Sequence, residues 1–143
     1  MKKQFFVLFF LPVLAFSQQS EVYKVRDFRV KNESVLLNHF KEFLQIPNIA
    51  SDLPNILKNA AWISNLMQSK GIANVQLLSP ITPDKPPAVY GEVITPGATE
   101  TVVFYAHYDG QPVDSTKWTN GLHPFKPQLT SNSLIKDGKI IPW

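Results

Sequence analysis

The chain has 143 residues, of which 44% are hydrophobic and 17% are charged, and its formal net charge is +3. Two of its 14 basic residues stand directly after Met1, so the rest of the chain is nearly balanced against 11 acidic residues. No basic face results, which excludes nucleic acid and an anionic membrane surface as expected partners. The absence of cysteine excludes disulfides, thiolate metal sites, a cysteine nucleophile and a lipoprotein lipidation site.

Residues 1–17 have the pattern of a signal peptide. Two lysines precede an almost unbroken apolar run over residues 5–16. This run is shorter than the roughly 20 residues that a membrane-spanning helix needs, and the small residues Ala15 and Ser17 match a cleavage site. We therefore expect cleavage after Ser17 and export to the periplasm or the medium, with no membrane contact afterwards. An uncleaved amphipathic anchor is the alternative, although the run lacks the polar face that such a helix needs.

Two amphipathic helices are predicted after a polar arm over residues 18–31, whose structure the sequence leaves open. The first helix has Asn32 as its N-cap and ends before Pro47. The second has Asp52 as its N-cap, carries a proline in its first turn and ends at Gly71. Apolar residues recur at spacings of three and four in both, namely Leu36, Leu37, Phe40, Phe43 and Leu44, then Ile56, Ala60, Ile63 and Met67.

Three strands are predicted next, over residues 74–78, 88–94 and 101–106, and the second has a possible bulge at Gly91. The six residues between the second and third strands are too few for a crossover helix, so these two strands are expected to run antiparallel. Near the end of the chain, Asp137-Gly138 stands between two apolar pairs and predicts a two-residue hairpin. The predicted fold class is therefore α/β, with a mixed sheet flanked by helices.

The third predicted strand leads directly into a histidine and an aspartate. His107 and Asp109 are two residues apart and would share one face of a strand, whereas Tyr108 would lie on the other face. Gly110 and Pro112 end the strand. An imidazole can bind a metal ion through one nitrogen while a nearby carboxylate fixes its orientation. The spacing alone supports a second interpretation equally well. In it, His107 is a hydrogen-bonded histidine at a strand end and Asp109 caps a turn.

The surrounding sequence resembles a known family. Residues 104–112 (FYAHYDGQP), then Trp118 and residues 124–127 (PFKP), resemble the co-catalytic zinc metallopeptidases, which include aminoacylase, glutamate carboxypeptidase and the carnosinase-like dipeptidases. The Asp-Gly-Gln-Pro ending and the tryptophan resemble the dipeptidase branch. The resemblance implies that residues 18–143 are the N-terminal part of such a catalytic domain. It also implies that His107 is a zinc ligand and that Asp109 is the catalytic-site carboxylate that orients the metal centre.

The sequence departs from the family's pattern in two places. Residues 120–123 form a small insertion, which leaves His123 without a counterpart in the family. The aspartate that bridges two zinc ions in the family is expected after Asp137-Gly138, and neither it nor the catalytic glutamates, the remaining ligands and the lid domain occur in this sequence. We therefore expect an incomplete domain. Asp114 is interpreted as a solvated turn residue, and His39 as a residue of the polar side of the first helix.

The function expected from the resemblance is that of the N-terminal portion of an exported metal-dependent dipeptidase. Such an enzyme hydrolyses amide bonds of a dipeptide or small peptide with water activated by two zinc ions. The alternative is a non-catalytic, truncated or split polypeptide that lacks the rest of the metal site. With only one ligand, the chain by itself is expected to be inactive, and a homodimer is expected only for a full-length form.

Overall fold

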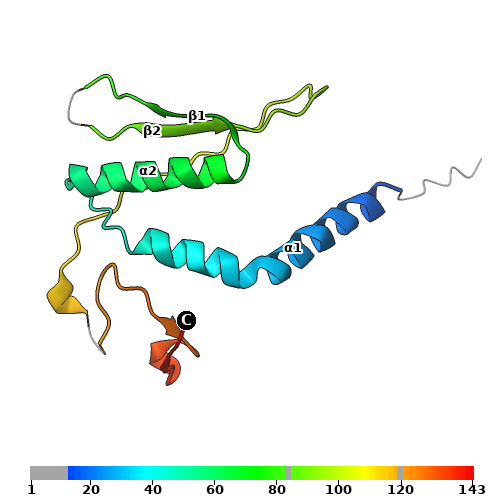
Figure 1. The fold of residues 1–143 in the computed structure, drawn as a ribbon. Coiled ribbons are helices and arrows are strands. Elements are labelled where there is room, and N and C mark those ends of the chain that lie inside the picture. The colour runs from blue at the N-terminus through cyan, green and yellow to red at the C-terminus, as the bar shows by residue number, and fades with distance from the viewer. Residues whose placement is uncertain (1–12, 83–84, 119–120) are drawn as a thin grey trace, which may run out of the picture. The chain divides into compact units, whose positions relative to one another are not determined.

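The computed structural model describes residues 13–82, 85–118 and 121–143. They form the helices α1 (Val13–Leu44) and α2 (Leu53–Ser69), shown with the strands in Figure 1. The strands are β1 (Ala73–Leu78), β2 (Ala88–Glu92), β3 (Leu129–Thr130) and β4 (Ile140–Ile141), and short 3-10 helices occur at Ser115–Lys117 and Leu134–Lys136. The chain divides into two units, Met1–His39 and Phe40–Trp143. This is an α/β combination, as predicted.

The first unit contains most of α1, which is a single helix through the predicted polar arm. Asn32 is not an N-cap, so this prediction was wrong: its side-chain amide lies inside α1 and donates to the carbonyl of Phe28 at 2.8 Å. Residues 13–44 contain neither glycine nor proline, and the Arg29–Glu33 ion pair at 2.7 Å supports the helix across this point. Most of the predicted signal peptide, residues 1–12, lies outside the described residues. None of the described helices is long and apolar enough to span a membrane.

In the second unit, α2 has the ends that the sequence predicts. The carboxylate of Asp52 accepts a hydrogen bond from the backbone N–H of Asn55 at 3.3 Å, and Gly71 adopts a φ of +74° just after the helix. The side chains of Ile56 and Ala60 are fully buried, and α2 packs against both β1 and β2 (Figure 1). This layer of one helix on one hairpin contains the core of the unit.

The antiparallel pair of β1 and β2 contains the predicted irregularity. The register changes between Ala73 and Gln76 of β1, so two residues of β1 lie opposite Gly91 alone, and the extra residue belongs to β1 rather than to β2. A Cβ atom on Gly91 would lie 2.5 Å from Cε of Met67 and 2.7 Å from Cγ2 of Ile72. Glycine therefore allows the helix to approach the sheet closely at this point.

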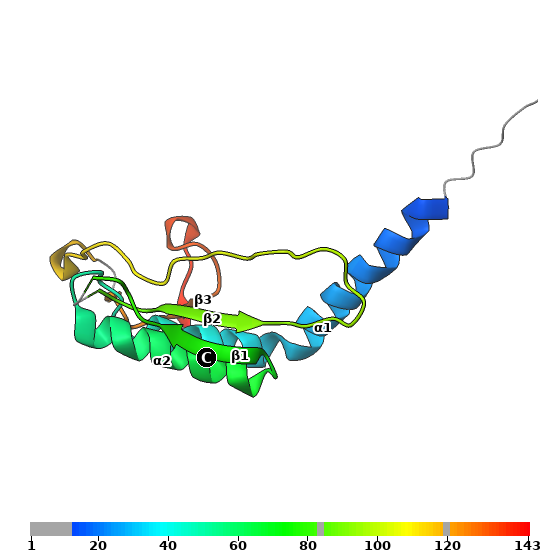
Figure 2. The ribbon, with the colours of Figure 1, turned by 90° about the horizontal axis from the view of Figure 1, so that it is seen from above.

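The third predicted strand does not form, which is a correction to the sequence analysis. Residues 101–106 have no strand partner and no backbone hydrogen bond to any described residue, and Figure 2 shows them as a plain trace after β2. Val102, Val103, Phe104 and Tyr105 are 73–93% exposed. A strand that is apolar on both faces needs cover on both faces, and among the described residues 101–106 have neither a neighbouring strand nor a covering helix that would give it.

The two-residue hairpin at Asp137-Gly138 was also predicted wrongly. β3 pairs antiparallel with β4, but the connection between them is longer, and residues 134–136 form a 3-10 turn. Asp137 has a φ of +57° and ends that turn, while the N–H of Gly138 donates to the carbonyl of Ser133 at 3.0 Å. The sheets of the described residues are therefore two separate antiparallel pairs, and the predicted single mixed sheet is wrong.

Candidate functional site

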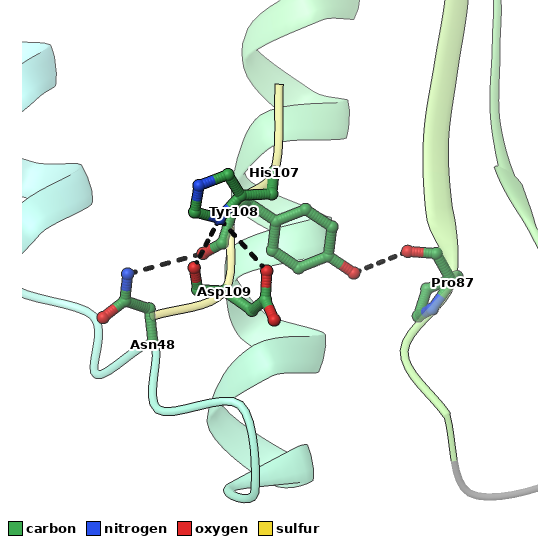
Figure 3. A network of polar contacts seen from close by, with 5 residues as sticks. All are labelled: Asn48, Pro87, His107, Tyr108 and Asp109. Carbon is green, nitrogen blue, oxygen red and sulfur yellow. Dashed lines mark hydrogen bonds and ion pairs between the residues drawn. The ribbon is translucent and has the colours of Figure 1, made fainter. Parts of the chain in front are cut away.

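The histidine and the aspartate of the motif lie in direct contact. The Nδ1 atom of His107 lies 2.8 Å from the backbone carbonyl oxygen of Asp109 and 3.3 Å from its carboxylate oxygen Oδ1 (Figure 3). A carbonyl oxygen can only accept a hydrogen bond, so Nδ1 is the nitrogen that carries the hydrogen. The imidazole is 74% exposed, and its Nε2 atom makes no hydrogen bond to any described residue.

The segment that carries this pair is fixed on both sides by residues far away in the sequence. The hydroxyl of Tyr108 donates to the carbonyl of Pro87 at 2.5 Å, just before β2, and points away from Asn48 (Figure 3). On the other side, the side-chain amide of Asn48 donates to the carbonyl of Tyr108 at 3.4 Å. Burial, with a smaller contribution from the Asp109 charge, raises the pKa of the Tyr108 phenol, which keeps the donor protonated.

A short parallel bridge completes the support. The N–H of Gly110 donates to the carbonyl of Asn48 at 2.6 Å, and the N–H of Ala50 donates to the carbonyl of Gly110 at 3.0 Å. A Cβ atom on Gly110 would lie 3.0 Å from the side-chain amide of Asn48, so glycine suits this close approach. The Asp-Gly step of the motif is therefore where the loop is joined to the segment before α2.

The segment before α2 is in turn fixed to the helix by a buried amide. Asn59 is 1% exposed, and its Nδ2 atom donates to the carbonyls of Pro47 at 2.8 Å and Asn55 at 2.9 Å. Sequence reasoning missed both Asn48 and Asn59. Asn48 directly follows the Ile46-Pro47 step, which is the one local signal that this segment is special. Asn59 stands three residues after Ile56 and four before Ile63, on the apolar face of the predicted helix, and this spacing is the signal that could have found it.

A cavity of about 520 Å³ opens beside His107 and Asp109. Its walls are mainly apolar and include Phe43, Ile63 and Tyr105. A space of this size falls within the range of about 300–1,000 Å³ that is typical of small-molecule sites. The imidazole and the carboxylate therefore lie beside a half-open, mainly apolar hollow.

The other titratable residues of the loop lie elsewhere. His123 borders a different cavity of about 450 Å³, together with Trp118 and Phe125, and its Nδ1 atom lies 2.7 Å from the carbonyl of Pro124. Asp114 caps the first 3-10 helix, where the side chain and the N–H of Thr116 hold the pKa of its carboxyl below the ordinary value. The interpretation of Asp114 as a turn residue is confirmed.

The described residues contain no group of three or more histidine, aspartate or glutamate side chains that could hold a metal ion together. His107 with Asp109 is thus a pair that offers one free ring nitrogen. Comparison of the chain with protein-family models, with curated proteins and with solved structures gave no match.

Proposed function

We propose that His107 supplies one imidazole ligand to the metal centre of an exported metal-dependent dipeptidase, and that Asp109 positions this imidazole. The proposal combines the family resemblance of residues 104–127 with the geometry of the His107–Asp109 pair. The single observation that carries it is the contact of Nδ1 with Asp109, because a hydrogen on Nδ1 leaves Nε2 of the neutral imidazole as the nitrogen with an accessible lone pair.

This tautomer is the one that metal binding through Nε2 requires. Histidines that bind a metal almost always donate their second ring N–H to a carboxylate, a backbone carbonyl or water, which fixes the ring and raises its basicity. His107 has both a carbonyl, at 2.8 Å, and a carboxylate, at 3.3 Å, as partners for Nδ1. The lone pair of Nε2 is then directed away from the loop in an exposed imidazole, where a cation can reach it.

Zinc in such a site supplies a Lewis acid that polarises the scissile carbonyl and lowers the pKa of bound water to about 7. The residues of this chain contribute the ligand, its orientation and the wall of the site. The apolar cavity of about 520 Å³ next to His107 has room for the side chain of a small peptide. One imidazole alone holds zinc loosely, so the proposal assigns one ligand pair of a larger site to this chain.

The test measures dipeptide hydrolysis and bound metal on the protein at the length that its native cell produces. His107→Ala is expected to lose metal and activity most severely, because zinc then lacks a direct ligand. Asp109→Asn is expected to lose roughly 10- to 100-fold, since it keeps the ligand but weakens its support. His123→Ala, in the other cavity, is the matched control and should be close to neutral.

A His107→Ala protein with full activity and full metal content would contradict the proposal. The 143-residue chain by itself should turn over no dipeptide with added zinc or manganese, and turnover would contradict the assignment of a single ligand pair. If the native-length protein is inactive and binds no metal, the alternative of a non-catalytic polypeptide holds.

A further inference from the structure

Asn48 supports the candidate site from a distant part of the sequence. Its side-chain amide donates to the carbonyl of Tyr108 at 3.4 Å (Figure 3), and its backbone carbonyl accepts from the N–H of Gly110 at 2.6 Å. Tyr108 and Gly110 are the two neighbours of Asp109 in the chain. A single residue therefore holds the peptide units on both sides of Asp109.

These two contacts determine the backbone conformation of Asp109. A residue has only two soft backbone dihedrals, and both are fixed once the peptide planes before and after the residue are fixed. The carbonyl of Asp109 belongs to the same peptide unit as the N–H of Gly110, and in a trans peptide the two groups point in opposite directions. Because this N–H points to Asn48, the Asp109 carbonyl points away from Asn48, and it lies 2.8 Å from Nδ1 of His107.

Asn48 is a firm support because the backbone beside it is anchored to helix α2. The carbonyl of the preceding residue, Pro47, accepts a hydrogen bond at 2.8 Å from the side-chain amide of Asn59, which is buried in α2. Asn48 itself is half-buried, whereas the imidazole of His107 is exposed. The orientation of the exposed ring is therefore transmitted from the core of the unit through Asn48 and Asp109.

The side chain of Asn48 suits this position in two ways. Its Nδ2 atom is a donor, as the carbonyl of Tyr108 requires. Its amide also lies directly against the backbone of Gly110, since a Cβ atom on that glycine would lie 3.0 Å from both Nδ2 and Oδ1 of Asn48. An aspartate would keep the shape of the side chain, but it would turn a carboxylate oxygen toward a carbonyl that cannot donate.

We infer that Asn48 is a positioning residue for His107. By holding both sides of Asp109, it directs the Asp109 carbonyl at Nδ1, keeps the hydrogen on that nitrogen and leaves the lone pair on Nε2. In this assignment Asn48 touches neither a metal ion nor a substrate and acts on the ring only through Asp109. The effect on metal binding rests on the function proposed above, whereas the effect on the tautomer of the ring does not.

The first test observes the His107 ring by long-range proton–nitrogen NMR correlation in the metal-free chain, at a pH of about 8 where an ordinary imidazole is neutral. The signal that His107→Ala removes identifies this ring among the three histidines. The native chain should carry the hydrogen on Nδ1. Asn48→Ala and Asn48→Asp should shift the tautomer ratio toward Nε2–H by about 2- to 10-fold, the ratio that one hydrogen bond supports. Asn65→Asp makes the same charge change at an exposed position of α2 and should leave the ratio unchanged.

Gly110→Ala disturbs the same contact from the other side. The new methyl group should push the Asn48 amide away from the Tyr108 carbonyl, so the tautomer ratio should shift as it does in Asn48→Ala. When Asn48→Ala is already present, the methyl group has room and Gly110→Ala should add little. Shifts that simply add would overturn the inference, because the two substitutions would then loosen the loop independently. Circular dichroism checks that each variant keeps its helix content.

The second test measures the zinc affinity of the native-length protein by dialysis against graded concentrations of a chelator. Asn48→Asp should lower the affinity about tenfold, as the loss of a residue that supports a metal ligand does, and Asn65→Asp should not. Zinc affinity that falls in His107→Ala but not in Asn48→Asp would overturn the role of Asn48 toward the metal.

A native chain with the hydrogen on Nε2 of His107 would overturn the inference, and so would an unchanged tautomer ratio in Asn48→Asp. If Asn48→Asp shifts the ratio while His107→Ala leaves zinc affinity unchanged, Asn48 does position the ring and the proposed function fails. The two proposals are therefore tested separately.

Discussion

The β1–β2 hairpin and residues 101–106 are both rich in apolar residues, yet only the hairpin becomes a sheet. β1 and β2 pair with each other and rest on α2, whose Ile56 and Ala60 are fully buried. Residues 101–106 follow a tight turn, in which the N–H of Ala98 donates to the carbonyl of Thr95 at 3.1 Å, but then remain unpaired. Composition makes a strand possible, and a paired neighbour with cover on its faces makes it form.

Because α2 and the β1–β2 hairpin bury apolar side chains and residues 101–106 do not, this layer supplies most of the stability of the second unit. Burial of apolar area is the main favourable contribution to folding, and the exposed segment contributes little of it. The exposed segment instead carries the two residues of the candidate site at its end. Substitutions in the two regions should therefore differ sharply in their effect on stability.

The largest effect is expected from Ile56→Ala. Removal of a fully buried isoleucine side chain leaves a cavity between α2 and the hairpin and should lower the free energy of unfolding by about 2–5 kcal/mol. Urea denaturation measures this change, with Leu57→Ala, half-exposed on the same helix, as the control. Equal losses in the two variants would show that the helix–hairpin layer is not the source of stability.

Gly91→Ala should follow, with a loss of about 1–3 kcal/mol, because the new methyl group would overlap the side chains of Met67 and Ile72. The loss should be smaller when Ile72→Ala is already present, since one of the two clashes is then relieved. The measurement is a double-mutant cycle of unfolding free energies. If the losses of unfolding free energy from the two substitutions simply added, the clash with Ile72 would not be the cause of the loss in Gly91→Ala.

Asp52→Ala removes the N-cap of α2 and should cost about 1 kcal/mol. In the native chain, the N–H of Asn55 donates to a carboxylate oxygen of Asp52 at 3.3 Å. Asp52→Asn keeps an oxygen that can accept this hydrogen bond, so it should retain most of the stability. Thermal melts of the three proteins compare these effects. A loss in Asp52→Asn as large as in Asp52→Ala would contradict a capping role.

A smaller, pH-dependent effect is expected from the hairpin's polar cluster. Hydrogen bonds from Tyr90 and then from Asn74 hold the pKa of the Glu92 carboxyl below its ordinary value of 4.5. A lowered pKa in the folded state stabilises the fold above the ordinary pKa, and this contribution is lost as the pH falls through the folded value. The melting temperature should therefore fall less steeply for Glu92→Gln than for the native chain between pH 5 and pH 3, and equal slopes would contradict it.

The smallest effect is expected from Val103→Ala, in the exposed segment. The change in unfolding free energy should stay within about 0.5 kcal/mol, as for other surface positions. A loss comparable to that of Ile56→Ala would show that the segment packs in the folded monomer, and the contrast between the two regions would fail.

Local chemistry explains which elements were predictable from the sequence. The N-cap at Asp52 and the stop at Gly71 depend on residues within one turn of the helix, so the ends of α2 are readable from the chain. The contact of His107 with Asp109 is equally local, since the two residues are two positions apart. Whether residues 101–106 form a strand could not be predicted from the sequence, because a strand needs pairing partners that are distant in the sequence.

Two further errors have the same physical origin. Asn32 has the right type for an N-cap, but its amide reaches the carbonyl of Phe28 and the helix continues. Asp137-Gly138 has the right type for a hairpin turn, but the turn is used to end a 3-10 helix. Both residue types suit more than one local backbone conformation, and contacts with the rest of the structure decide which conformation forms. The support of the site by Asn48, 60 residues before Tyr108, was equally beyond local reasoning.

The bridge between Ile49 and Gly110 has a consequence for the order of folding. It closes a loop that contains α2, β1 and β2, and the entropy cost of closing a loop rises with its length. The paired residues of β1 and β2 are closer in the sequence than Ile49 and Gly110 are, so we expect the hairpin and its helix to form first and to shorten the remaining loop before the bridge closes. The segment with His107 would then be the last part of this unit to order and the first to open, and the amide of Gly110 should exchange with solvent faster than that of Ile56.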